Sequence, residues 1–139
     1  MRKSKDCFTV EDANSSFTVD IGSKRACILM SYALQHGGGG LSEGALTNWV
    51  LEGKLHHTDD SWCLLSEHVN DLRLSCNPTH GVAIGLWPLA VCRPFRYIRV
   101  RMTGSNSNGK HVLAVSGMEL YGALIRTNDG TRLRSDLQT

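Results

Sequence analysis

Hydrophobic and polar side chains alternate within the stretch Phe95–Gly122, and the rest of the sequence can be ordered around it. In its first half Ile98, Val100 and Met102 share one parity, whereas a tyrosine and two arginines occupy the other. A period of two is typical of a strand with one buried and one solvated face. The segment Thr103–Lys110 is rich in glycine and asparagine and has no apolar side chain, which is typical of a turn. The pattern therefore predicts two strands that form a hairpin.

Further strand-like stretches precede this pair. Trp49 and Leu51 share the apolar parity in Ala45–Gly53, so we expect both in the core. The stretch Trp62–Leu65 is predicted to pair back on the end of this strand as a second hairpin. The other predicted strands are Cys7–Val10, Phe17–Gly22, Ala26–Leu34 and Leu86–Leu89. Because Pro88 lacks a backbone N–H, it restricts the last of these to a sheet edge or a strand end.

The apolar stretch Ala26–Leu34 could be a helix or a strand by its pattern alone, but its length and the flanking turns favour a strand. Cys27, Leu29 and Ser31 would lie on one face of this strand. Ile28, Met30 and Tyr32 would lie on the opposite face. No stretch shows a helical period over three turns. The sum is seven or eight short strands separated by turns, which predicts an all-β fold, an antiparallel β-sandwich or jelly roll.

The chain length fits one domain. There are 139 residues, of which 41% are hydrophobic and 20% charged, as in ordinary globular proteins. We expect the sandwich to occupy residues 1–125 and residues 126–139 to form a flexible polar tail. The net charge of +2 is too small to imply a nucleic acid or an anionic membrane as partner. No apolar run approaches the ~20 residues of a membrane helix, and no secretory signal pattern is present.

The five cysteines have no metal-binding or disulfide spacing. Their number is odd, and no two are separated by the two residues that zinc sites use. We therefore interpret them as free thiols in a reducing compartment. Cys27 and Cys63 lie within apolar runs and are expected to act as small core side chains.

Several short motifs occur in an order that resembles a known family. They are the strand end Phe17–Gly22, the strand Ala45–Gly53 with its tryptophan, the later Trp62, the Trp87-Pro88 pair, Phe95–Val100, Thr103-Gly104 and Ser116–Gly122. Together they resemble the discoidin-like, coagulation-factor C-type module with the galactose-binding-domain-like jelly roll. The resemblance covers about residues 8–124. It is closest to the intracellular subset found in HECT-type ubiquitin ligases and BTB-domain proteins.

The sequence departs from this family at defined places. Thr47 stands where arginine is usual, Lys54–Asp60 is longer than the usual turn, and Leu72–Gly85 differs throughout. A ligand held by those loops in the family cannot be transferred to this chain. The resemblance to secreted members would also imply a disulfide joining the domain ends, but no cysteine follows Cys92. Its absence agrees with an intracellular, cytoplasmic or nuclear, location.

Ligand contacts on such scaffolds usually lie in loops at one end. We expect them in three loops, His36–Glu43, Lys54–Ser61 and Gly104–His111. The individual candidates are His36, Glu43, His56, His57, Asp59, Asn106, Lys110 and His111. A metal site is not predicted, because adjacent His56 and His57 would point in opposite directions, and calcium remains only a minor alternative.

Arginines provide a second set of candidates. Arg99 and Arg101 would project from one face of their strand, near Arg96. We expect a solvated outer face that pairs with Glu119 across the predicted hairpin. The competing interpretation is a contact with an anion or an acidic peptide. The residues Trp49, Trp62, Trp87 and Tyr121 are expected in the core rather than at a ligand.

The residues favour a binding module over an enzyme. No nucleophile elbow or positioned catalytic base is evident, and no cofactor motif is complete. The first hypothesis is a noncatalytic module, part of a larger ligase-type or BTB-type protein, that recruits a protein or peptide. The alternative is a glycan- or lipid-headgroup-binding domain, and the third is a purely structural domain. The oligomeric state and the partner's identity do not follow from the sequence.

Overall fold

The computed structural model describes residues 7–8, 12, 14–36, 44–74, 84–128 and 132–134. Within these ranges the chain is all-β and contains no helix. The strands are β1 (Cys7–Phe8), β2 (Ser16–Asp20), β3 (Arg25–His36), β4 (Trp49–Lys54), β5 (Cys63–His68), β6 (Ile84–Pro88), β7 (Tyr97–Met102), β8 (Ala114–Asn128) and β9 (Arg132–Arg134). Accordingly, no helix in the described part of the chain could cross a membrane.

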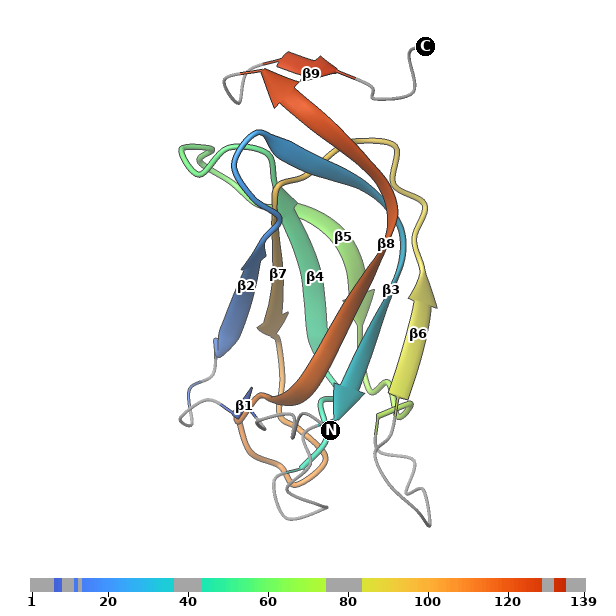
Figure 1. The fold of residues 1–139 in the computed structure, drawn as a ribbon. Coiled ribbons are helices and arrows are strands. Elements are labelled where there is room, and N and C mark those ends of the chain that lie inside the picture. Colours follow the sequence, from blue (N-terminus) through green and yellow to red (C-terminus); the bar gives the residue numbers. More distant parts are fainter. Residues whose placement is uncertain are drawn as a thin grey trace.

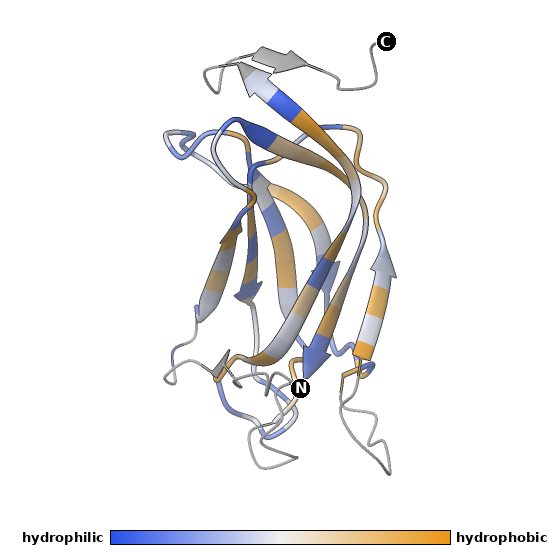
Figure 2. Cartoon of the chain, viewed as in Figure 1, coloured by the Kyte–Doolittle hydropathy of each residue, from blue (hydrophilic) through white to orange (hydrophobic). Residues whose placement is uncertain are grey.

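The strands form two antiparallel sheets that face each other (Figure 1). The first sheet has the order β1-β8-β3-β6, with β9 added to the far end of β8. The second has the order β2-β7-β4-β5. Hydrophobic and hydrophilic residues alternate along the strands (Figure 2), so each sheet turns one apolar face toward the other. The predicted antiparallel β-sandwich is therefore confirmed.

The core lies between the two sheets, and much of it follows from the alternation. Trp49 and Leu51 of β4 are completely buried, as are Ile98, Val100 and Met102 of β7. These five positions are the ones that period-2 patterning assigned to the core. The largest other buried side chains are Leu29, Tyr32, Leu34, Leu46, Leu74, Phe95 and Leu113. Each such side chain contributes about 1.5–3 kcal/mol when removed from water.

A β-bulge in β3 changes which residues face the core. The register with β8 shifts between Leu29 and Ser31, which leaves Met30 bulged and 67% exposed. Beyond the bulge Tyr32 and Leu34 are buried, on the same side as Leu29. The predicted grouping of Ser31 with Leu29 is therefore wrong, because one extra residue inverts the parity of everything after it.

The predicted hairpin of β7 and β8 is also wrong. β7 pairs with β2 and β4, whereas β8 pairs with β3 from Arg25 to His36 in the opposite sheet. The residues between β7 and β8 therefore cross from one sheet to the other. Local alternation identifies strands, but it does not say which strands pair. Because β3 is longer than β7, it forms more cross-strand pairs with β8 than β7 could.

Other pairing predictions are confirmed. β4 and β5 form the expected hairpin, with Gly53 opposite Cys63. β6 is an edge strand, and Pro88 is its last residue. β8 continues to Asn128, so residue 126, the expected start of the tail, lies inside a strand.

Loops emerge at two ends of the sandwich (Figure 1). At one end lie the β2–β3 turn, the β4–β5 turn and the start of β7; we call this the turn end (residues 21–25, 55–62 and 93–96). At the other end lie residues 44–48, 69–74 and 103–113, which we call the loop end.

Candidate functional site

Two of the three loops expected to bind a ligand lie at opposite ends of the sandwich. The β4–β5 turn, which carries His56, His57 and Asp59, is at the turn end (Figure 1). The connection between β7 and β8 is at the loop end. These two loops therefore do not form one surface, because the length of the strands separates them. Residues 37–43 of the third expected loop lie outside the described residues.

The candidates at the loop end serve largely to build that end. Asn106 is 4% exposed, and its side-chain oxygen accepts hydrogen bonds from the backbone N–H of Asn108 and Lys110. His36 is a buried residue of β3 rather than an exposed loop residue. Lys110 is exposed, and Glu43 lies outside the described residues.

The last loop-end candidate, His111, acts through its backbone. Its carbonyl oxygen accepts from the N–H of Asp12 at 3.0 Å, which ties the β7–β8 connection to the segment before β2. The imidazole is half-buried. None of the described contacts brings it toward His56 or His57.

The turn end contains a cavity of about 430 Å³ whose lining is strongly basic. Four segments meet there: the β2–β3 turn, the β4–β5 turn, the start of β7 and the end of β8. Among the described residues, no aspartate or glutamate lines it. The basic lining residues are Lys24, Arg25, His56, His57 and Arg96. We call this cavity the basic pocket.

The remaining lining of the basic pocket can donate hydrogen bonds and make apolar contacts. Ser23, Thr58 and Thr127 contribute hydroxyl groups, and Leu55 and Tyr97 contribute apolar surface. A cavity of this size and composition can hold one small anionic group together with a few flanking atoms.

One of the pocket cations is already neutralised. Arg96 donates from Nε to Oδ1 of Asp20 at 2.8 Å and from Nη2 to Oδ2 at 3.0 Å. The hydrogen bond from Arg96 holds the pKa of Asp20 below its ordinary value, and the same bond raises the pKa of Arg96. The guanidinium also lies 4.9 Å from the centre of the Tyr97 ring.

Two other cations of the basic pocket lack such a partner. Among the described residues, no ion pair involves the side chain of Lys24 or Arg25. Lys24 lies in the turn between β2 and β3, where its φ is positive at 59°, and Arg25 is the first residue of β3. Within the described residues, the pocket therefore keeps an excess of positive charge that an external anion could neutralise.

A neighbouring cavity of about 550 Å³ has mixed charge. Asp59 and Asp60 line it together with Lys54 and Arg93. Asp59 also accepts from the backbone N–H of His56 at 3.0 Å, which fixes the β4–β5 turn. Because acids and bases are balanced there, this cavity offers less selectivity for an anion.

The predicted arginine candidates separate into two groups. Arg96 lines the basic pocket, whereas Arg99 and Arg101 lie on the outer face of the second sheet. Arg99 Nη2 and Arg101 Nε donate to one oxygen of the buried Glu52 at 3.1 and 2.8 Å. Glu52 thus takes the part expected of Glu119, which belongs to the other sheet.

The aromatic residues predicted for the core also fall into two groups, one buried and one partly exposed. Trp49 and Trp87 are buried, as predicted. Trp62 is only half-buried, and its ring lies 4.1 Å from the guanidinium of Arg99. Tyr121 is 46% exposed, so its assignment to the core is wrong. It lies on β8 opposite Ser31, immediately after the bulge that inverts the parity of β3.

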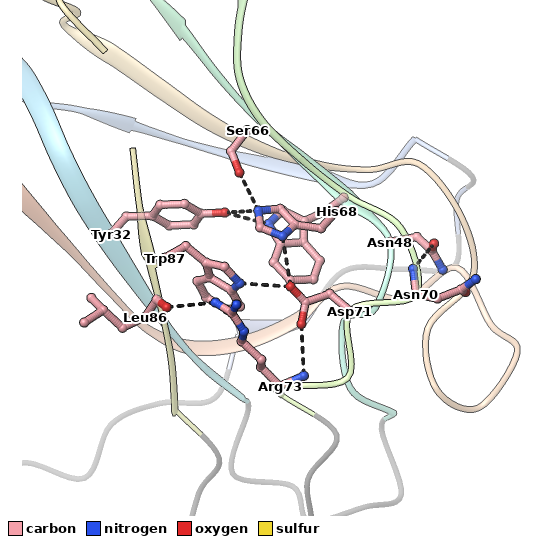
Figure 3. Close-up of polar contacts among 10 residues, drawn as sticks. Tyr32, Asn48, Ser66, His68, Asn70, Asp71, Arg73, Leu86 and Trp87 are labelled. Carbon is pink, nitrogen blue, oxygen red and sulfur yellow. Dashed lines mark hydrogen bonds and ion pairs between the residues drawn. The ribbon is translucent and has the colours of Figure 1, made fainter. Parts of the chain in front are cut away.

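Near the loop end, Tyr32, His68 and Asp71 form a buried polar network (Figure 3). The Tyr32 hydroxyl lies 2.7 Å from His68 Nε2, and His68 Nδ1 lies 3.0 Å from Asp71 Oδ2. Trp49 donates to the Tyr32 hydroxyl at 3.1 Å, and Trp87 donates to Asp71 Oδ2 at 2.9 Å. Every polar tip in this aromatic cluster is therefore matched.

Burial sets the protonation of the network. It raises the pKa of Tyr32 to about 12. It also lowers the pKa of His68, and this outweighs the opposite effect of Asp71. Burial alone would raise the pKa of Asp71, but hydrogen bonds from Arg73, Trp87 and His68 lower it instead. The network is thus a neutral imidazole beside an ionised carboxylate.

Ser66 completes this arrangement and is not among the residues predicted from the sequence. Ser66 Oγ lies 2.5 Å from His68 Nε2, so Ser66, His68 and Asp71 have the connectivity of a nucleophile, a base and an orienting acid. The spacing of 66, 68 and 71 on one strand and its following turn is a signal that could have indicated it.

The surroundings give this network a structural role. His68 is stacked on Trp49 with ring centres 4.1 Å apart, and its Nε2 is shared with the Tyr32 hydroxyl. Asp71 in turn accepts from the backbone N–H of Arg73 at 3.0 Å, and Arg73 Nη1 donates to the carbonyl of Leu86 (Figure 3). The network therefore fastens residues 69–74 to β6. In the described residues no group of three potential metal ligands converges.

Solved structures with the same arrangement of strands define the class of fold. Module CBM32-3 of a family 31 glycoside hydrolase from Clostridium perfringens superposes with a TM-score of 0.63 over 84% of this chain and 74% of its own, at 12% identity. The lectin domain of lectinolysin, solved with Lewis B antigen, gives 0.60 over 85% and 72%, at 16% identity. The chain therefore has the galactose-binding-domain-like β-sandwich fold.

The curated proteins with similar sequences are much longer than this chain. The chain is 30% identical over 131 residues to the E3 ubiquitin-protein ligase Ufd4 of Drosophila melanogaster, and 31% identical over 123 residues to the E3 ubiquitin-protein ligase hecd-1 of Caenorhabditis elegans. These alignments cover 91% and 86% of this chain, but the chain spans only 4% of the length of either ligase. No protein-family model matches the sequence.

Proposed function

We propose that this domain is a noncatalytic interaction module that recruits a protein partner through the basic pocket. The observation that carries the proposal is the convergence of Lys24, Arg25 and Arg96 in a cavity whose described lining residues include no carboxylate. Arginine and lysine side chains in such a setting favour carboxylate or phosphate groups. An acidic segment of a protein would supply them.

The relatives suggest the setting in which recruitment would occur. Both are ubiquitin ligases of which the chain spans a small part, which supports a role as an accessory domain. We propose that the domain belongs to the intracellular discoidin-like subset of HECT-type ligases and BTB proteins. In such a protein it would bring a partner or substrate to the ligase while other parts perform the chemistry. The location would be cytoplasmic or nuclear.

Of the residues expected from sequence, His56, His57 and Arg96 are retained as binding candidates because they line the basic pocket. Lys24 and Arg25 are added to them. Arg99 and Arg101 are not retained, because they lie on the outer face of the second sheet, where both donate to Glu52, and do not line the basic pocket.

Carbohydrate binding is the second candidate function, and the similarity to a lectin domain and to carbohydrate-binding modules favours it. A neutral glycan would be bound by hydroxyl-directed hydrogen bonds and an apolar platform, and would leave the two cations unpaired. A glycan that bound the domain independently of Lys24 and Arg25 would support this alternative.

The test is site-specific photo-crosslinking. A photoreactive amino acid replaces Leu55 in the basic pocket or, as a control, the exposed Lys110 at the loop end. We expect protein adducts from cell extract at position 55 and not at position 110, and we expect Arg25→Glu to abolish them. Equal crosslinking at both positions, or adducts unaffected by Arg25→Glu, would contradict the proposal.

A further inference from the structure

The excess charge of the basic pocket is concentrated in one turn. Arg96 is matched by Asp20, whereas Lys24 and Arg25 are adjacent and have no ion-pair partner among the described residues. Two neighbouring cations fit a ligand with two negative charges better than one with a single charge. We infer that the pocket binds the phosphoryl group of a phosphorylated protein segment, an inference that rests on the proposed function.

The two cations are held by backbone hydrogen bonds on both sides. The N–H of Arg25 donates to the carbonyl of Gly22 at 3.2 Å, which closes the turn. The carbonyl of Lys24 accepts from the N–H of Thr127 at 2.8 Å, which fastens the turn to β8. The turn is therefore in place before a ligand arrives, and binding orders only the side chains.

The donors of the basic pocket match a phosphoryl group. Besides the cations, Ser23 and Thr58 provide hydroxyl groups, and a phosphoryl group offers three strong acceptor oxygens and close to two negative charges. The volume of about 430 Å³ admits such a group and adjacent side-chain atoms. Leu55 and Tyr97 give apolar contact to the flanking residues of a peptide.

A protein segment is favoured over a nucleic acid. The charge of the whole chain is only +2, and the described cations at the loop end are not continuous with the pocket. Nucleic-acid sites of useful affinity require many phosphate contacts along a track. A compact pocket with two cations that have no ion-pair partner among the described residues suits a single phosphoryl group.

The experiment measures fluorescence anisotropy with three labelled degenerate peptide libraries. Their central residue is phosphoserine, glutamate or serine, and the protein is the full 139-residue chain. We expect the phosphoserine library to bind most tightly and inorganic phosphate to compete with it. Lys24→Gln and Arg25→Gln should each weaken binding by about tenfold. Lys110→Gln, which makes the same change in net charge at the loop end, should leave it unchanged.

Each contrary outcome has a distinct meaning. If the glutamate library binds as tightly as the phosphoserine library with the same dependence on Arg25, the inference is wrong and the proposed recruitment of an acidic segment stands. If no library binds, the inference is also wrong, and crosslinking at position 55 decides the proposed function separately. A further contrary outcome is that a single-stranded RNA or a phosphoinositide vesicle displaces the phosphopeptides through contacts that Arg25→Gln abolishes. In that case the pocket binds the phosphate of that competitor, and the inference of a phosphorylated protein segment is wrong.

Discussion

The guanidinium of Arg96 and the carboxylate of Asp20 are joined by two nearly parallel hydrogen bonds of 2.8 and 3.0 Å. Asp20 ends β2 and Arg96 precedes β7, so the pair links two neighbouring strands at the turn end. It also decides how much of the pocket's charge is available to a ligand. The exposed position limits its value to stability, because water and salt screen such pairs.

The first prediction concerns this pair. Asp20→Asn removes the carboxylate that occupies Arg96, so we expect anionic peptides to bind about threefold more tightly at low salt. Anisotropy titrations at low and high ionic strength would measure this. Asp60→Asn, an exposed acid outside the basic pocket, changes the net charge equally. The same gain from both variants would show that long-range charge, and not the release of Arg96, is responsible.

The second prediction concerns the buried hydroxyl at the centre of the aromatic cluster. Tyr32→Phe leaves the indole N–H of Trp49 and the Nε2 of His68 without that partner. We expect a loss of about 1–3 kcal/mol in the free energy of unfolding, measured by urea denaturation. Tyr121→Phe, at a surface tyrosine, should change it by less than about 0.5 kcal/mol. Equal effects would mean that the network adds nothing to stability.

The third prediction follows from the protonation of His68. Its pKa in the folded state is below the ordinary value of 6.5, so the unfolded chain binds more protons as the pH falls. Stability from the neutral imidazole is therefore complete above pH 6.5 and decreases as the pH falls below it. Denaturant unfolding across this window should show the loss, and His68→Gln should show less of it than His57→Gln. A stability that rises toward acid pH would refute the assignment.

The fourth prediction tests the close approach behind the β3 bulge. A Cβ atom on Gly122 would overlap the carbonyl of Ile28, which is part of the backbone and cannot move aside cheaply. We expect Gly122→Ala to destabilise the fold by about 1–3 kcal/mol or more, seen as a lower midpoint of thermal unfolding. Ala123→Ser, at the next and exposed position, serves as the control. If Gly122→Ala matches it, the strands are not as close there as described.

Sequence patterns predicted the individual strands better than their partners. Period-2 alternation correctly assigned Ile98, Val100 and Met102 to the core, because side-chain direction is a local property of a strand. Pairing is not local, so β7 and β8 were joined in a hairpin although they belong to different sheets. The bulge at Met30 has no sequence signature of its own, and it inverted the predicted faces of β3.

The candidate site shows the same limit. The sequence predicts His56 and His57 as loop residues and Arg96 as part of an arginine patch, and the fold brings all three into one pocket. Lys24 and Arg25 have no binding signal in the sequence, where they belong to an ordinary polar turn. Their importance depends on the absence of a nearby acid, and that depends on which segments meet at the turn end. Sequence alone cannot supply this information.

The bond from Arg73 to the carbonyl of Leu86 has a consequence for behaviour at high concentration. β6 is the edge strand of its sheet, and its aliphatic Ile84 and Leu86 are more than half exposed. An exposed apolar edge strand favours self-association, because a strand of a second molecule can pair with it. Arg73 occupies the carbonyl of Leu86 on this edge strand, and Pro88 has no backbone N–H to donate to a further strand. A protein with Arg73→Ala should therefore aggregate sooner than the unmodified chain, even where its fold is intact.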